Sequence, residues 1–192
     1  MLVLILGLLV FLGVHSVRIV ADGWRAQTIT RIGALPWKAL YSVASIVGFG
    51  LIVWGFGLAR QQPVQWWSPP PAMRHVAALL TLAAFVLLAA AYVPGNAIKA
   101  RLHHPMVLAV KAWALAHLLA NGNAAHIVLF GAFLVWAALS FSAARRRDRG
   151  AGTVYAPGNT VATVTTVVAG AVAWAVFAFW LHGWWIGIRP LS

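Results

Sequence analysis

Two histidines lie inside long apolar stretches of this sequence, where a polar side chain needs a partner. His15 follows an uninterrupted run of uncharged residues, and His117 lies within the apolar stretch 112–130. An ionisable residue in such a stretch usually faces the protein interior and is paired. It can form an interhelical hydrogen bond, and a neutral imidazole is also a ligand for metals and haem iron. Both readings are open for these two residues.

The other residues favour haem over a metal ion. The chain has no cysteine, and its only acidic residues, Asp22 and Asp148, lie in loop-like segments. Zinc and two-metal centres need more ligands than two histidines supply. Haem b needs one or two axial histidines, an apolar slot and cations for its propionates. Haem is therefore the cofactor that His15 and His117 could hold, and helix packing stays open as the alternative.

The residues around His117 suit such a site. On a helix, Trp113, His117 and Asn121 share one face, which would place an aromatic wall and an amide beside the ligand. Basic residues nearer the loops could take the propionates: Arg18, Arg31, His103, His104 and Lys111.

The predicted depths of the two histidines differ. His15 lies near the cytoplasmic end of its segment, because Arg18 follows. His117 lies near the outer end of its own segment if that helix begins at Pro105. With a rise of about 1.5 Å per residue, the two rings would lie several ångströms apart in depth.

The composition is that of a membrane protein. Hydrophobic residues make up 62% of the 192 residues and charged residues 8%, whereas soluble domains carry about 25% charged residues. The expected fold is an all-α, polytopic transmembrane helical bundle, because lipid leaves backbone groups no partner outside the chain. Six spans are predicted: 1–19, 37–58, 75–93, 105–121, 124–144 and 162–188. The first lacks a basic leader and a cleavage site, and we expect it to be retained.

The net charge of +12 belongs to the loops. The first, third and fifth connections carry most of it: Arg18, Arg25, Arg31, Lys38, Lys99, Arg101, Lys111, Arg145, Arg146, Arg147 and Arg149. The opposite side carries Arg60, Arg74 and Arg189. This asymmetry predicts that these three connections are cytoplasmic and that both termini are on the non-cytoplasmic side. Lipid headgroups, rather than nucleic acid, are the expected anionic partner.

Several motifs resemble one family. They include His15-Ser16 followed by Arg18, the tripeptide at 104–106, and the block 111–122, which reads KAWALAHLLANG. With these motifs, residues 1–148 resemble the NnrU family of membrane proteins, and residues 149–192 are expected to form a loop and a sixth span. The family is named for an association with nitrite and nitric oxide reduction, and it is similar to 15-cis-zeta-carotene isomerase. In that enzyme two histidines, which correspond to His15 and His117, are thought to hold a b-type haem.

The sequence also departs from these relatives. The isomerase has a cysteine one turn before the second histidine, where this chain has Ala114, so a thiolate cannot replace the imidazole here. The usual Arg-His-Pro of the family is His103-His104-Pro105, which changes a propionate or headgroup contact.

The resemblance implies a multi-pass protein of the bacterial inner membrane that binds haem b and has a redox or isomerase activity, with a hydrophobic small molecule as substrate. The alternative is a non-enzymatic accessory protein that assists the assembly of denitrification enzymes, with histidines used only in helix packing. A transporter is a third reading, but the sequence has no inverted repeat and no carboxylate inside a span.

Overall fold

The structure is a computed structural model that describes residues 1–191, and the part it describes is built from helices. The elements are α1 (Leu2–Val20), α2 (Asp22–Ile32), α3 (Ala34–Gln61), α4 (Met73–Tyr92), α5 (Ala97–Leu102), α6 (Pro105–Ala120), α7 (Ala124–Ala151), α8 (Thr160–Val176), the π-helix η1 (Phe177–Leu181) and α9 (His182–Ile186). The predicted all-α fold is confirmed.

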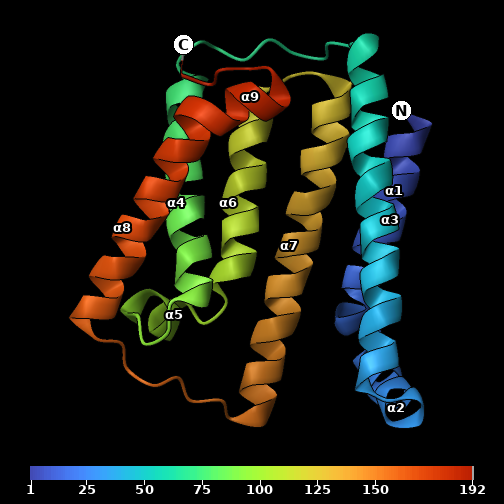
Figure 1. Cartoon of the computed structure of the whole chain (residues 1–192), viewed down its shortest axis with the longest axis vertical. Helices are drawn as coiled ribbons and strands as arrows, with labels where there is room; N and C mark the ends of the chain where they lie inside the picture. The colour runs from blue at the N-terminus through green and yellow to red at the C-terminus, as the bar shows by residue number, and fades with distance from the viewer. Residues whose placement is uncertain (192) are drawn as a thin grey trace.

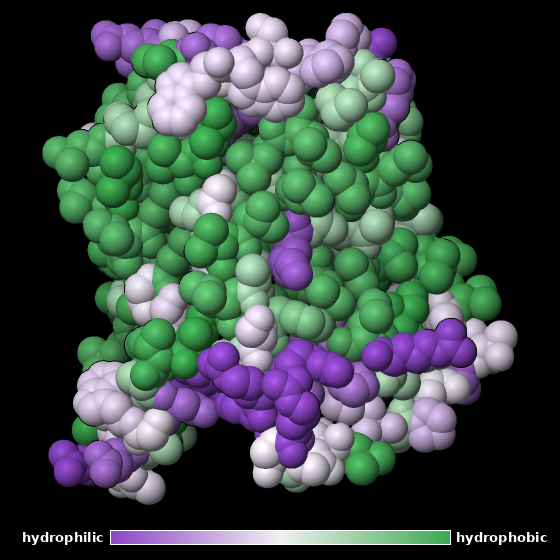
Figure 2. Space-filling view, turned by 180° about the vertical axis from the view of Figure 1, so that it is seen from behind, coloured by the Kyte–Doolittle hydropathy of each residue, from purple (hydrophilic) through white to green (hydrophobic). Residues whose placement is uncertain are grey.

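Within residues 1–191, five helical stretches are long and apolar enough to cross a membrane: α1, α3, α4, α7 and the continuous run from α8 to α9. The fourth predicted span, 105–121, corresponds to α6, a shorter apolar helix of 16 residues. On the face shown in Figure 2, hydrophobic side chains form a broad belt between more hydrophilic ends. The chain is therefore a polytopic membrane protein whose belt faces lipid.

The helices lie side by side in the order α8, α4, α6, α7, α1 and α3 (Figure 1). Both termini lie at one end of the molecule, and α2, α5 and the segment 152–159 lie at the other. Hydrophilic side chains collect at the α2 and α5 end (Figure 2). The termini thus share one side, as the loop charges predict.

Two short helices were not predicted. Helix α2 occupies a segment that the sequence predicts to be a loop. The prediction failed because the polar residues of this segment leave no continuous apolar stripe. It begins at Asp22, whose carboxylate suits a helix N-terminus, and ends before Gly33, which has φ +89°. Helix α5 begins after Asn96, whose side chain accepts a hydrogen bond from the Lys99 N–H at 2.7 Å. The turn predicted at 94–96 therefore also starts a helix.

Glycines bring α1 and α3 into close contact. A Cβ added at Gly7 would lie 2.6 Å from the backbone nitrogen of Ile52, and one added at Gly48 would lie 2.7 Å from the backbone nitrogen of Phe11. Small residues at such contacts let the backbones of membrane helices approach each other. The position of α1, which carries His15, is thus set by α3.

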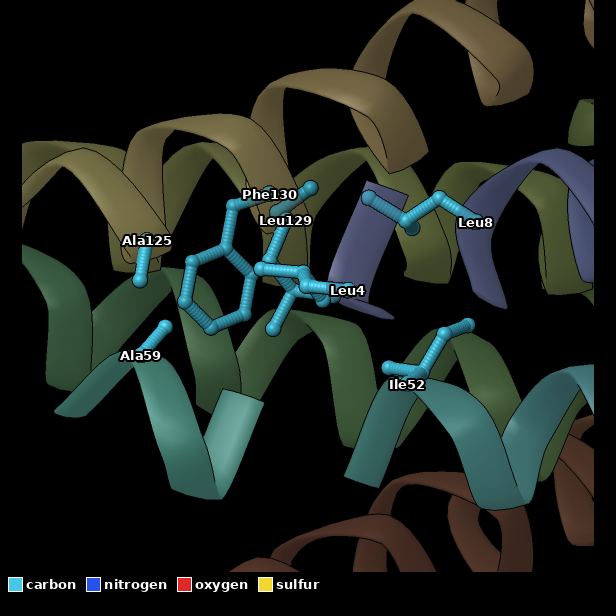
Figure 3. Close-up of a cluster of buried hydrophobic side chains, with 8 residues drawn as sticks. Leu4, Leu8, Ile52, Ala59, Ala125, Leu129 and Phe130 are labelled. Carbon is cyan, nitrogen blue, oxygen red and sulfur yellow. The ribbon is translucent and has the colours of Figure 1, made fainter. Parts of the chain in front are cut away.

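The buried core lies where α1, α3, α6 and α7 meet (Figure 3). Its members are small or apolar: Leu4, Leu8, Ile52, Ala59, Ala114, Ala125, Leu129 and Phe130. Leu4 lies near the start of α1, Ala59 near the end of α3 and Ala125 at the start of α7, and these helix ends lie at the end of the molecule that carries the chain termini (Figure 1).

Candidate functional site

His15 is held in one orientation by its own helix. Its Nδ1 lies 2.7 Å from the carbonyl oxygen of Phe11, one turn earlier. Because a carbonyl only accepts, Nδ1 carries the hydrogen and Nε2 carries the lone pair of the neutral ring. The ring stacks on Phe11 at 4.2 Å and meets Tyr41 and Trp136 at 5.1 and 6.1 Å. This tautomer is the one in which Nε2 can bind a metal.

His15 lines a cavity of about 750 Å³, which we call the basic cavity. It is bounded by α1, α2, α3, α6, α7 and Thr153, at the end of the molecule that carries α2 and α5. Its volume falls within the range of small-molecule and cofactor sites. Its apolar and aromatic walls include Val14, Val17, Trp37, Tyr41, Val107 and Trp136.

The charge of the basic cavity is unbalanced. Its lining carries one carboxylate, that of Asp148, against four cations: Arg18, Arg25, Lys38 and Arg147. Arg18 and Arg25 also lie 3.9 and 3.7 Å from a carboxylate oxygen of Asp22. The excess of cations beside apolar walls favours an anionic ligand with an apolar body.

His117 has the same hydrogen-bonding pattern in another place. Its Nδ1 donates to the carbonyl oxygen of Trp113 at 2.8 Å, and its ring stacks on Phe130 at 4.4 Å. The Asn121 side chain donates to the His117 carbonyl oxygen at 2.9 Å. Trp113 and His117 thus share a face of α6 as predicted. The Asn121 amide, however, bonds to the backbone at the end of this helix.

Aromatic rings fill the space between His15 and His117. The ring of Phe11, stacked on His15, lies 5.9 Å from that of Phe133, which lies 5.5 Å from Trp113. Trp113 in turn lies 5.3 Å from His117. A continuous series of ring contacts therefore connects the two imidazoles in this structure.

The two histidines also lie at different depths. His15 is beside Trp136 and His117 is beside Phe130, both on α7. Those two positions are six residues apart, about 9 Å along a helix axis. The depth difference expected from the sequence is present, and α6 does begin at Pro105.

The remaining predicted residues divide between two places. Arg18 and His104 line the basic cavity with His15. Lys111 places its ammonium 5.3 Å from the ring centre of Phe141 and is not part of the lining. The structure thus brings together three of the predicted residues and leaves His117, Trp113, Asn121 and Lys111 elsewhere.

Sequence reasoning missed several lining residues. In the sequence, nothing distinguishes Trp136 from a tryptophan that faces lipid. Likewise, Arg25, Lys38 and Arg147 look like ordinary loop charges. Asp148 carried the clearest signal, because it is one of two acidic residues and is surrounded by arginines.

The fold and site define a polytopic helical membrane protein with a cation-lined cavity at one end. Residues 3–190 match the family described as NnrU protein. The chain belongs to the NnrU family, and the predicted resemblance is confirmed. The match extends beyond residue 148 and takes in α8, η1 and α9. No curated protein and no solved structure matches the chain.

Proposed function

We propose that this NnrU family protein binds one b-type haem in the basic cavity, with His15 as the protein ligand to iron. The observation that carries the proposal is the Nδ1 bond from His15 to the Phe11 carbonyl, which leaves the Nε2 lone pair on a ring that lines the cavity. A histidine whose second nitrogen is tied in this way has the orientation that haem ligation requires.

The lining suits the rest of the cofactor. Valine side chains with Trp37, Tyr41 and Trp136 offer an apolar slot for a flat macrocycle. The four cations offer partners for two propionates, and guanidinium groups bind carboxylates in bidentate fashion. His117 would then be a packing residue, in contrast to the pair of ligands that the sequence predicts.

The number of histidines that bind the haem iron determines which reactions the haem could support. A haem held by His15 alone would supply a site for a diatomic molecule such as nitric oxide, and the polarity of the cavity would control that binding. Binding or redox chemistry of nitric oxide therefore fits the cavity better than electron transfer by a bis-histidine haem. It also agrees with the association after which the family is named.

We further propose that the membrane is the bacterial cytoplasmic membrane and that the basic cavity opens toward the cytoplasm. The positive charges of the loops support this orientation. The chain has no cysteine, so single cysteines can be introduced in α2 and in the 62–72 connection. A membrane-impermeant maleimide applied to intact cells should label only the second.

Haem content tests the main proposal. The protein should be purified after expression with ample haem, and a pyridine haemochrome spectrum should be recorded for wild type, His15→Ala, His117→Ala and His75→Ala. His75 is exposed at the start of α4 and serves as the control. We expect one haem per chain in wild type, His117→Ala and His75→Ala, and loss of haem in His15→Ala alone.

Other results would change the conclusion. Haem retained with an unchanged spectrum in folded His15→Ala refutes the ligand assignment. Loss of haem from both His15→Ala and His117→Ala would restore the bis-histidine arrangement and require the intervening rings to move. A colourless wild-type protein would favour the accessory function, with both histidines used in packing.

A further inference from the structure

One carboxylate at the edge of the basic cavity gathers three groups that are distant in sequence. Oδ2 of Asp148, on α7, lies 2.8 Å from Nε2 of His104 and 3.0 Å from the hydroxyl oxygen of Tyr155. Nδ1 of His103 lies 4.0 Å from the same oxygen. The cluster joins the start of α6, the end of α7 and the segment 152–159, and an acidic residue is rare in this chain.

The contact with Asp148 determines which nitrogen of His104 is available. A carboxylate only accepts, so Nε2 of His104 carries a hydrogen and Nδ1 carries the lone pair of the neutral ring. His104 is the N-cap residue of α6, yet its side chain makes no capping bond. Within residues 1–191, Nδ1 makes no hydrogen bond and is not among the buried unpaired atoms.

The neighbouring histidine is occupied differently. Nδ1 of His103 accepts a hydrogen bond from Arg145 at 2.6 Å, and its ring stacks on Tyr155 at 4.1 Å. His103 has φ +67°, a left-handed backbone conformation that non-glycine residues rarely adopt. The ring lone pair of His103 is therefore taken by Arg145, whereas the structure shows no donor to the lone pair of His104 within residues 1–191.

Other charged and titratable groups line the same cavity as His104 and Asp148. The other titratable and charged groups that line the cavity are His15 and Arg18 on α1, Arg25 on α2, Lys38 and Tyr41 on α3, and Arg147 on α7. Tyr155 bonds to Asp148, and Arg145 bonds to the neighbouring His103. Among these groups, His104 is the imidazole that a carboxylate orients, an arrangement that supports proton transfer.

We propose that His104, oriented by Asp148, is the acid–base group of the basic cavity. It acts on a ligand that carries an acidic O–H or N–H group: that bond breaks, the proton bonds to Nδ1, and the ligand keeps the electron pair. Asp148 stabilises the resulting imidazolium, and the proton returns by the reverse step. The proposal rests on the basic cavity being the ligand site and does not depend on the ligand being haem.

The tautomer of His104 gives the first test, on protein free of haem. Heteronuclear NMR of isotope-labelled histidine in detergent micelles distinguishes the two neutral forms of the ring. We expect the Nε2–H form for His104 in wild type and in Asp22→Asn, and a mixture of forms in Asp148→Asn. Asp22 is the matched control because it is the other acidic residue. An Nδ1–H ring in wild type, or no change in folded Asp148→Asn, overturns the proposal.

Chemical modification tests the free nitrogen in the same haem-free protein. Diethyl pyrocarbonate should modify His104, as mapped by peptide mass spectrometry, with exposed His75 as the positive control for the reagent. Modification of His75 without modification of His104 overturns the proposal. The NMR and modification experiments need no cofactor. They therefore test the roles of His104 and Asp148 even if the haem proposal fails.

A third measurement uses haem as the probe in loaded protein. We expect the Soret band to depend on pH in wild type and His75→Gln but not in His104→Gln. An unchanged pH response in folded, haem-loaded His104→Gln would show that this imidazole exchanges no proton with the ligand site.

Discussion

Replacing Gly48 by alanine should disturb the site through the contact between α1 and α3. Gly48 faces the backbone of Phe11, whose carbonyl oxygen accepts the hydrogen bond that orients His15. A methyl group at this position meets backbone atoms, which cannot rotate away as the end of a side chain can. The substitution therefore pushes the turn of α1 that fixes the histidine.

The structure indicates how large the effect should be. The added Cβ would lie 2.7 Å from the Phe11 nitrogen, whereas ordinary contact begins at 3.4 Å. The helices must separate locally by about 0.7 Å, and a gap of that size removes about a quarter to a half of the dispersion energy of each contact. Overpacking of this kind costs about 1–3 kcal/mol, or roughly 2–4 °C in Tm per kcal/mol for a chain of this length.

Gly50 provides a matched control on the same helix. A Cβ at Gly50 would meet nothing within 4 Å, so alanine there should be neutral or stabilise α3 by up to about 1 kcal/mol. Thermal unfolding in detergent, followed by circular dichroism, measures the difference. The reasoning is refuted if Gly48→Ala is as stable as Gly50→Ala. Haem content measured on the same samples should fall in Gly48→Ala and stay at the wild-type level in Gly50→Ala.

Three further predictions concern polar contacts. Thr81→Val should destabilise the α4–α8 contact by about 0.6–1.7 kcal/mol in thermal unfolding, because the Trp174 indole N–H loses its acceptor at 3.0 Å. Asn96→Ala should cost about 2–4 kcal/mol, because a buried amide that caps α5 and binds two carbonyl groups is lost; equal stability of the variant would contradict this. Burial and the bond to Asp148 raise the pKa of Tyr155, so the tyrosinate absorbance that Tyr155→Phe removes should appear above about pH 10. Tyr155 ionises at lower pH in the unfolded chain than in the folded protein. Its contribution to the free energy of unfolding is therefore complete below about pH 10 and is lost as pH rises further.

The membrane-spanning helices could be predicted because length and hydropathy are local properties. The spans expected at 105–121 and 124–144 appear as Pro105–Ala120 and Ala124–Ala151. The second continues past the apolar region because its arginines are good helix formers that reach water. Helices α2 and α5 were missed because they are short, polar and stabilised by caps and by contact with larger helices.

The chemistry of the candidate site was only half visible in the sequence. The types of residue pointed to His15 and His117, and both rings have the tautomer that suits a metal. Their separation depends on where Phe11, Phe133 and Trp113 pack, and no local pattern encodes that. The pairing of His104 with Asp148 joins residues 44 positions apart, which a motif search does not find.

The sequence by itself determined the class of protein, the common side of the two termini and the basic character of the opposite end. These follow from the lengths of apolar runs and the placement of charges, which act on each segment separately. Only the tertiary structure decided which histidines share a cavity, which carboxylate orients His104 and which rings separate His15 from His117. Those outcomes depend on side-chain volumes meeting across helices, and a close-packed interior has room for one arrangement of them.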